Sequence, residues 1–220
     1  MGWIDGKADP SCPLCKTSIE GWEYGELTSH EAVRDVIHVE NIENDAELYW
    51  QGFGDNRRKV KVNLQDGQVQ YFEGPKDQER MVKVEFPSGQ MVFYEGLMDQ
   101  ERKVKVEFPD GQVVFYKGPR GQERFVRVES QSGPVAFFEG DRNQEHLVRV
   151  RFQKGQVEYY EGSKNQERKV KLEFPTGQVE YFKGPKGEER RVKVEYPTGK
   201  VEYFEGPKDQ ERRVRVEPIL

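Results

Sequence analysis

The chain of 220 residues has little of what a thick core, a metal site or an active site requires. Hydrophobic residues make up 34% of it, no more than the charged residues, and it contains two cysteines and three histidines. Aromatic residues, at 12%, argue against disorder, because disordered segments are depleted in them. The composition therefore favours an ordered but thin structure with a large surface.

Neither sign of charge dominates, and long apolar runs are missing. The 35 basic and 40 acidic residues are interspersed, which is unlike the basic stripe typical of nucleic-acid-binding proteins. No apolar run approaches the ~20 residues of a membrane span, and the N-terminus lacks the apolar core of a signal peptide. We expect a cytoplasmic protein that does not bind nucleic acid. Peripheral lipid contact is not expected either, because acidic residues interrupt every basic row.

What the sequence does contain is a repeat with a period of 22 residues. Glycine returns at this interval in two columns, and valine and a basic residue return in one column each. The first glycine column is Gly52, Gly74, Gly96, Gly118, Gly140, Gly162, Gly184 and Gly206, and the basic column is Lys61, Lys83, Lys105, Arg127, Arg149, Lys171, Lys193 and Arg215. A worn copy precedes them at residues 36–52. We therefore divide the chain into an N-terminal segment, residues 1–35, and a repeat array, residues 36–220.

Each repeat predicts a β-hairpin. In VKVEFPDGQVVFYKGP, which runs from Val104 to Pro119, apolar and polar residues alternate with the period of a half-buried strand. Proline and glycine favour a turn at Pro-Asp-Gly, and GPRGQE marks a second turn. The predicted fold is all-β, an elongated antiparallel meander of tandem hairpins. A parallel β-solenoid is the alternative, but it would stack the basic column at about 4.8 Å, with like charges opposed.

The register of the hairpin decides which side chains share a face. With an even number of residues in the Pro-Asp-Gly loop, one face carries Val104, Val106, Phe108, Val113 and Phe115. The opposite face then carries Lys105, Glu107, Val114 and Tyr116, where lysine meets the aromatic row or pairs with glutamate. An exposed valine–phenylalanine strip of this length needs a cover, so we expect either a homodimer through that face or a tightly curled monomer.

The aromatic pair in each repeat, such as Phe115-Tyr116, places one ring on each face of the sheet. One row is expected to pack structurally. The other is covered by the GPKDQE-type loops or exposed to a partner protein. The residues of this candidate partner-binding stripe are Tyr94, Tyr116, Tyr160, Phe182 and Phe204.

The Pro-x-Gly turn followed by an aromatic–acidic–glycine element, as in YFEGP and FYEG, resembles MORN repeats. The resemblance covers about residues 49 to 217. It implies an antiparallel sheet of tandem hairpins with a scaffolding, self-association or membrane-proximal role. The chain departs from the family where a Gly-x-Gly is usual, because Val82-Lys83-Val84 and its equivalents stand there.

The N-terminal segment holds both cysteines, Cys12 and Cys15, at a spacing that suits one tetrahedral metal ion. The surrounding residues resemble the last third of a RING finger. That resemblance implies zinc at the two cysteines, and contact with a ubiquitin-conjugating enzyme through Trp3, Pro13 and Lys16. Six of the eight RING ligands would have to precede Met1.

Two alternatives for the cysteine pair stay open. It is an incidental feature, or it forms a separate zinc site with His30 and His38, at a spacing outside the usual one. The following residues predict a short helix that caps the first strand, because Thr28 and Glu31 have capping-box spacing and Val36 and Ile37 extend an apolar face.

No trio of nucleophile, base and orienting residue can be assembled from three histidines and scattered serines. His146 occupies a column otherwise filled by arginine, so we interpret it as a substituted arginine. The Gln-Glu-Arg columns are interpreted as surface charge. We expect a non-enzymatic interaction or scaffold module with no cofactor apart from the zinc considered above. The alternative is the substrate-binding part of a RING-type ubiquitin ligase.

Overall fold

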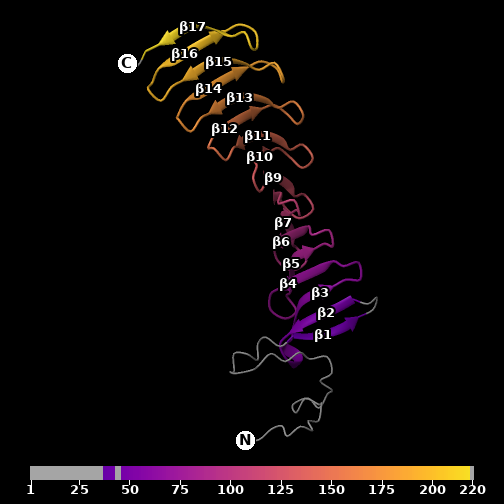
Figure 1. The fold of residues 1–220 in the computed structure, drawn as a ribbon. Helices are drawn as coiled ribbons and strands as arrows, with labels where there is room; N and C mark the ends of the chain where they lie inside the picture. The colour runs from indigo at the N-terminus through magenta and orange to yellow at the C-terminus, as the bar shows by residue number, and fades with distance from the viewer. Residues whose placement is uncertain (1–36, 43–45, 219–220) are drawn as a thin grey trace, which may run out of the picture. The chain divides into compact units, whose positions relative to one another are not determined.

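The computed structural model describes residues 37–42 and 46–218. These residues form seventeen antiparallel strands in one open sheet, which confirms the predicted all-β meander (Figure 1). The strands are β1 (Ile37–Ile42), β2 (Ala46–Gln51), β3 (Arg58–Asn63), β4 (Val69–Glu73), β5 (Arg80–Glu85), β6 (Met91–Glu95), β7 (Arg102–Glu107), β8 (Val113–Lys117), β9 (Arg124–Glu129), β10 (Val135–Glu139), β11 (His146–Arg151), β12 (Val157–Glu161), β13 (Arg168–Glu173), β14 (Val179–Lys183), β15 (Arg190–Glu195), β16 (Val201–Glu205) and β17 (Arg212–Glu217).

A single turn of 3-10 helix, η3 (Gly54–Asn56), interrupts the strands of the described chain. Most of the expected N-terminal cap, and the boundary expected at residue 35, lie outside the described residues. Ile37, expected on the helix of that cap, instead opens β1. A β-branched residue suits a strand, and the alternating stretch after it pairs with β2.

The array divides into two compact units. Unit 1 contains the described residues up to Pro87 together with Gly96–Glu101, and unit 2 contains Ser88–Glu95 and the chain from Arg102 onward. Within unit 1, β1 to β4 each pair with the next strand in the sequence. Within unit 2, β6 to β16 do the same. Short hairpin connections therefore account for every one of these pairings.

The turn between β7 and β8 shows that the predicted register is wrong. The N–H of Gly111 donates to the carbonyl of Phe108 at 2.9 Å, and Gly111 has a φ of 81°. A type I turn that ends in a left-handed glycine closes a three-residue loop, and three is an odd number. Lys105 therefore lies opposite Phe115, not on the other face from it. Pro-Asp-Gly favoured a turn, but the hydrophobic pattern alone did not determine its length.

Two faces follow from this register. The basic–aromatic face carries Lys105, Glu107, Val113 and Phe115 and their equivalents in other repeats, because Lys105 pairs with Phe115 and Glu107 with Val113. The valine face carries the pair Val106 and Val114 and their equivalents. Alternate residues of each strand thus belong to alternate faces.

A β-bulge recurs where each hairpin meets the next. Between β8 and β9, Phe115 pairs with Arg127 and Tyr116 with Phe125, so that Val126 has no partner of its own. The same shift occurs between β4 and β5 and between β12 and β13. The valines that recur every 22 residues at the positions of Val104 and Val126 are therefore the bulge residues, and they differ from the valines of the valine face. A bulge bends the strand and increases its twist at the same place in every repeat.

The first glycine column is required by the loop that follows each aromatic pair. Gly118 has a φ of 122°, and a Cβ atom there would lie 2.7 Å from the carbonyl oxygen of Gln122. An L side chain is disfavoured by the dihedral angle and again by the collision. This explains why glycine returns at this position in every repeat.

The core lies on the valine face. Val106 is 3% exposed, Val114 is 8% exposed, and Val194, in the same column as Val106, is 1% exposed. Because these valines are buried within a single chain, the exposed valine–phenylalanine strip of the sequence prediction does not form. The homodimer stays a prediction, but the exposed strip through which it was expected to form does not exist.

Candidate interaction surfaces

The basic–aromatic face carries a ladder of alternating cations and rings. The Nζ atom of Lys105 lies 3.8 Å from the ring centre of Phe93, and the guanidinium carbon of Arg127 lies 3.8 Å from that of Phe115. Equivalent contacts join Lys83 to Tyr71, Arg149 to Phe137, Lys193 to Tyr181 and Arg215 to Tyr203. Cation–π contacts were expected for this column, but with the Tyr116 row. The corrected register assigns them to the Phe115 row.

Most cations of the ladder also pair with a carboxylate two residues later on the same strand. Lys105 Nζ lies 2.8 Å from Glu107, and Lys171 Nζ lies 2.5 Å from Glu173. Where the ring is tyrosine, its hydroxyl joins the pair, as Tyr159 does by donating to Glu173 at 2.9 Å. Hydrogen bonds from Lys171 and Tyr159 hold the pKa of Glu173 below its ordinary value, against the effect of burial. The face is therefore charged but largely neutralised within itself.

The candidate partner-binding stripe lies on the valine face. Its members, Tyr94, Tyr116, Tyr160, Phe182 and Phe204, are half-buried. Lys103 Nζ lies 3.8 Å from the ring centre of Tyr116, and burial, followed by the charge of Glu145, raises the pKa of the Tyr116 hydroxyl. The rings cover the valine core as well as facing outward. Their role in binding a partner stays a prediction.

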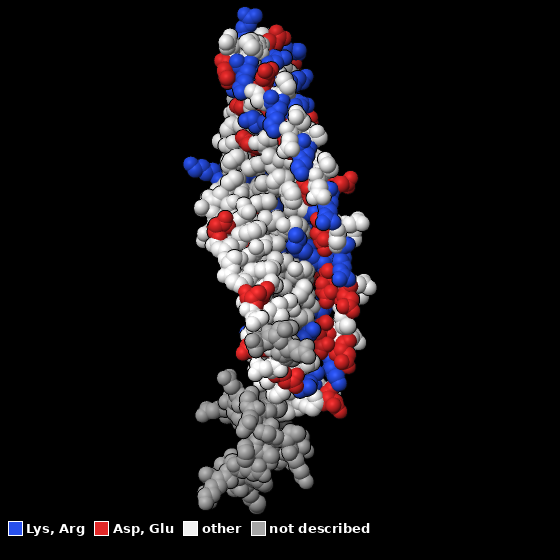
Figure 2. Space-filling view, turned by 90° about the vertical axis from the view of Figure 1, so that its right-hand side faces the viewer, with Lys and Arg blue, Asp and Glu red and all other residues white. Residues whose placement is uncertain are grey.

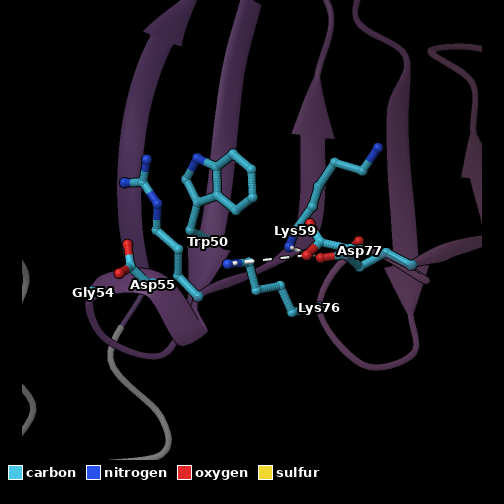
Figure 3. A pocket seen from close by; sticks show the side chains of 8 residues that line it. Trp50, Gly54, Asp55, Lys59, Lys76 and Asp77 are labelled. Carbon is cyan, nitrogen blue, oxygen red and sulfur yellow. Dashed lines mark hydrogen bonds and ion pairs between the residues drawn. The ribbon is translucent and has the colours of Figure 1, made fainter.

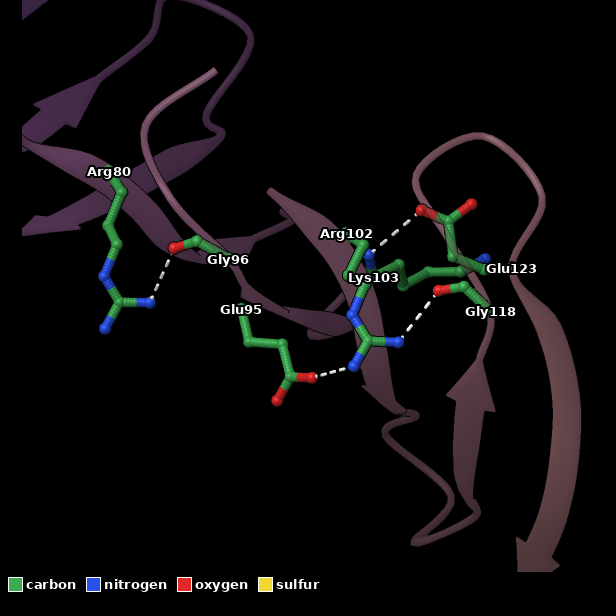
Figure 4. A network of polar contacts seen from close by, with 7 residues as sticks. All are labelled: Arg80, Glu95, Gly96, Arg102, Lys103, Gly118 and Glu123. Carbon is green, nitrogen blue, oxygen red and sulfur yellow. Dashed lines mark hydrogen bonds and ion pairs between the residues drawn. The ribbon is translucent and has the colours of Figure 1, made fainter. Parts of the chain in front are cut away.

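The glutamates of the Gln-Glu-Arg columns hold successive repeats together. Glu123 accepts the backbone N–H of Lys103, twenty residues earlier, at 3.3 Å (Figure 4). Burial opposes ionisation of Glu123, but N–H groups of Glu123, Gly121 and Lys103 hold its pKa below the ordinary value. Lys59, Met81 and Arg191 donate to Glu79, Glu101 and Glu211 in the same way. The prediction of mere surface charge is therefore wrong for this column.

The arginines of these columns make a second inter-repeat hydrogen bond. Arg102 donates from Nη1 to the carbonyl of Gly118 at 2.8 Å, and its Nη2 pairs with Glu95 (Figure 4). In unit 1, Arg80 donates likewise to Gly96 at 3.2 Å. His146 begins β11 as Arg102 begins β7, in agreement with its interpretation as a substituted arginine. The repetition of Glu-Arg was visible in the sequence. The acceptor sixteen residues after the arginine and the N–H donor twenty residues before the glutamate were not.

A groove of about 350 Å³ opens in unit 1 beneath the loop that follows β4 (Figure 3). Arg57 lies over the indole of Trp50 at 4.9 Å, and both side chains donate to Glu40 at 2.9 Å. Burial opposes ionisation of Glu40, and the two hydrogen bonds lower its pKa below the ordinary value. The remaining lining is Gly54, Asp55, Lys59, Lys76, Asp77 and Glu79. An aromatic floor with charges of both signs suits a polar peptide.

An equivalent groove of about 320 Å³ occurs in unit 2. Phe182 takes the repeat position of Trp50, six repeats later, and the same shift brings Lys76, Asp77 and Glu79 to Lys208, Asp209 and Glu211. The groove is thus a property of the repeat, assembled from its loop and the aromatic residue of an earlier hairpin. Periodicity was visible in the sequence, but the groove required the fold of the loop.

Three carboxylates replace apolar residues on the valine face toward the end of the array. Glu158, Glu180 and Glu202 stand in the column of Val114, and their side chains are 15%, 13% and 6% exposed. Glutamate in an alternating strand is typical of a solvent-facing position, but this column is largely buried. Arg213 and Lys200 lie 2.8 and 2.7 Å from Glu202. Close cations allow these carboxylates to occupy a buried column.

The predicted residues of the N-terminal segment lie outside the described residues. These are Trp3, Cys12, Pro13, Cys15, Lys16 and His30. His38 lies half-buried on β1 with its Nδ1 3.8 Å from Glu40, which agrees with a residue of the strand surface. In the described chain, no three His, Cys, Asp or Glu side chains are arranged to hold a metal ion.

Comparison with known proteins gives no family for this chain. No protein-family model matches it, and a search of curated proteins finds no similar sequence. Residues 37–42 and 46–218 include no helix with the length and apolar character needed to cross a bilayer. On the face seen in Figure 2, basic and acidic side chains are interspersed.

Proposed function

We propose that the array is a non-enzymatic protein-interaction or scaffold module that offers equivalent grooves to partners at more than one repeat. The observation that carries the proposal is the recurrence of the Trp50 groove at Phe182. A repeated groove gives a partner several equivalent positions, and linked positions raise the overall affinity without new contacts. Inter-repeat hydrogen bonds support the proposal because Glu79 and Glu211, which line the two grooves, accept the backbone N–H groups of Lys59 and Arg191.

A peptide-display selection against the immobilised chain, followed by calorimetry, tests this proposal. We expect the best peptide to bind at more than one site per chain. Lys76→Glu and Lys208→Glu should each remove one site, whereas Lys154→Glu, an exposed lysine in a turn outside both grooves, should remove none. A stoichiometry of one that neither groove variant changes would contradict repeated grooves.

Within this function we propose a MORN-like identity for the array. The observed tandem hairpins, each with a Pro-x-Gly turn and an aromatic–acidic–glycine element, support the resemblance. The bulged Val-x-Val stretch, where that family has Gly-x-Gly, distinguishes these repeats from it.

A second candidate is the substrate-binding part of a RING-type ubiquitin ligase. It rests on the sequence around Trp3, Cys12 and Cys15, which resembles the end of a RING finger. Because two cysteines are far fewer than eight ligands, we expect this chain to bind at most one zinc ion, weakly. Metal analysis after chelation tests this: zinc retained at one equivalent would contradict it.

A further inference from the structure

The ladder on the basic–aromatic face is interrupted at β11 in unit 2. In neighbouring repeats the cation has a carboxylate two residues later, as Arg127 has Glu129 at 3.0 Å. On β11 that position holds Arg151, which is exposed. Arg149 lies over the Phe137 ring at 4.0 Å. Within the described residues, neither Arg149 nor Arg151 forms an ion pair, so two guanidinium groups share one face without a carboxylate.

The same stretch of the ladder lacks its hydroxyl groups. Tyr159 and Tyr181 each donate at 2.9 Å to a carboxylate on the first strand of the next hairpin. The equivalent residues in the preceding repeats are Phe93, Phe115 and Phe137, which have no hydroxyl to donate. This part of the face is therefore more apolar than the part formed by β12 to β15, and it adjoins the two unpaired arginines.

A groove of about 470 Å³ lies on this stretch of unit 2. Its apolar lining is Val104, Val126, Phe115 and Phe137, with part of Tyr116, and its charged lining is Arg102, Lys117 and Arg127 against Glu95 alone. The Nε atom of Arg127 is buried and has no hydrogen-bond partner among the described residues. The groove thus combines an apolar floor with an excess of guanidinium and ammonium donors.

The occupant that fits is anionic and partly apolar. Guanidinium groups bind carboxylates with a planar, bidentate geometry. Arg127 and Arg149 already cover the rings of Phe115 and Phe137, so these rings do not offer an open face on which a nucleobase could stack. Charge complementarity therefore favours an acidic peptide over a single-stranded nucleic acid.

We propose that this groove binds an extended acidic segment of a partner protein. Its apolar side chain lies against Val104 and Val126. Its carboxylates pair with Arg149, which contacts the Phe137 ring of the groove, and with Arg151 two residues later on the same strand. Residues two apart on a strand are separated by about 6.7 Å, so a Glu-x-Glu segment in extended form matches the two arginines. The proposal rests on the array being an interaction module, and it adds the partner's chemistry and a site distinct from the Trp50-type grooves.

The test uses the full chain and a fluorescein-labelled peptide, Ser-Phe-Ser-Glu-Ser-Glu-Ser, with fluorescence anisotropy as the measurement. Arg151→Glu restores the carboxylate that most repeats have, so it should fold at least as stably as the wild type. We expect it to weaken peptide binding at least ten-fold. Lys183→Glu makes the same charge change at an exposed position on β14 and should alter binding less than two-fold.

The outcomes that overturn the proposal are distinct. Wild-type affinity in Arg151→Glu, no binding by the wild type at millimolar peptide, or equal losses in both variants would each do so. A peptide with glutamine in place of glutamate should bind at least ten-fold more weakly. Displacement of the peptide by a single-stranded oligonucleotide, lost in Arg151→Glu, would assign the groove to nucleic acid instead. Failure of the proposed function would be seen in a separate measurement, as a peptide stoichiometry that neither Lys76→Glu nor Lys208→Glu changes.

Discussion

At the scale of single residues, glycine determines the loop geometry and the buried valines determine the core. Gly118 and Gly121 belong to the same loop and both have positive φ angles, of 122° and 75°. They differ in their surroundings, because a Cβ at Gly118 would collide with a carbonyl oxygen whereas one at Gly121 would meet open space. Alanine substitutions at these two glycines therefore distinguish the destabilisation caused by the backbone dihedral angle from that caused by a collision.

We expect Gly118→Ala to lower the free energy of unfolding by about 2–3 kcal/mol, because dihedral strain and collision add. Gly121→Ala should lower it by roughly 1 kcal/mol, from the dihedral alone. Urea unfolding followed by circular dichroism measures both. Equal losses would mean that the close approach at Gly118 is relieved at little cost.

A second comparison at this scale concerns the most buried column. Val194 is 1% exposed and Val216, in the same column on β17, is 44% exposed. Val194→Ala should lower the free energy of unfolding by about 2 kcal/mol, because two methyl groups are lost and a cavity remains. Val216→Ala should lower it by less than about 0.5 kcal/mol. If thermal unfolding shifts equally for the two variants, the valine face is not the core.

At the scale of the element, the hairpin of β15 and β16 contains a carboxylate whose ionisation stabilises the fold. Glu202 accepts hydrogen bonds from Lys200, Arg213 and Tyr196, which lower its pKa to about 2. The folded state binds its proton less readily than the unfolded state does. Glu202 therefore contributes stability above about pH 4.5, and that contribution disappears as the pH falls toward 2.

We expect Glu202→Gln to lower the urea midpoint at pH 7 and to lower it much less at pH 2.5, where most of the contribution of the ionised carboxylate is lost. The difference between the two pH values, measured for wild type and variant, isolates this carboxylate from the others. Glu205→Gln, an exposed carboxylate on the same strand, serves as the control. An effect of Glu202→Gln that is the same at both pH values would show that the loss is one of packing.

In the hairpin of β7 and β8, the strands could be predicted from the sequence, but the register and the distant contacts could not. Period-2 alternation and the Pro-Asp-Gly turn predicted the strands, because both signals depend only on residues close together in the sequence. The predicted register was wrong because a loop with an odd or an even number of residues leaves the same alternating pattern in the two strands. The left-handed conformation of Gly111 is what gives this loop three residues. The groove at Trp50 and the role of Glu123 depend on residues twenty or more positions away, which a local pattern does not reveal.

At the scale of the whole molecule, the array should behave as a chain of repeats coupled to their neighbours. The inter-repeat hydrogen bonds span sixteen, twenty or twenty-one residues, less than one repeat period. Removing residues 164–185, one full period, leaves equivalent donors and acceptors at the same spacings. Removing residues 164–174 deletes one strand, β13, and therefore moves the hydrogen-bond donors and acceptors on either side of it out of their repeat spacing. Stability in repeat proteins is approximately a sum over repeats and interfaces.

We therefore expect the chain that lacks residues 164–185 to keep its circular dichroism spectrum per residue and a cooperative transition, with a melting temperature lower by a few degrees. The chain that lacks residues 164–174 should lose much more, because two strands of the same type then follow one another. Comparable melting temperatures for the two deletions would refute neighbour coupling with a period of 22 residues.

The hydrogen bonds to Glu123, Gly118 and their equivalents run in one direction along the chain, and this has a consequence during synthesis. Lys103 and Arg102 donate to Glu123 and Gly118, which are later in the chain, and the same forward direction holds at Arg80 and Met81. A ribosome adds about 5–20 residues per second, so each new repeat takes roughly 1–4 s to emerge. Each repeat thus waits for the next before its loop contacts are complete, and the growing chain stabilises one hairpin at a time behind its newest end.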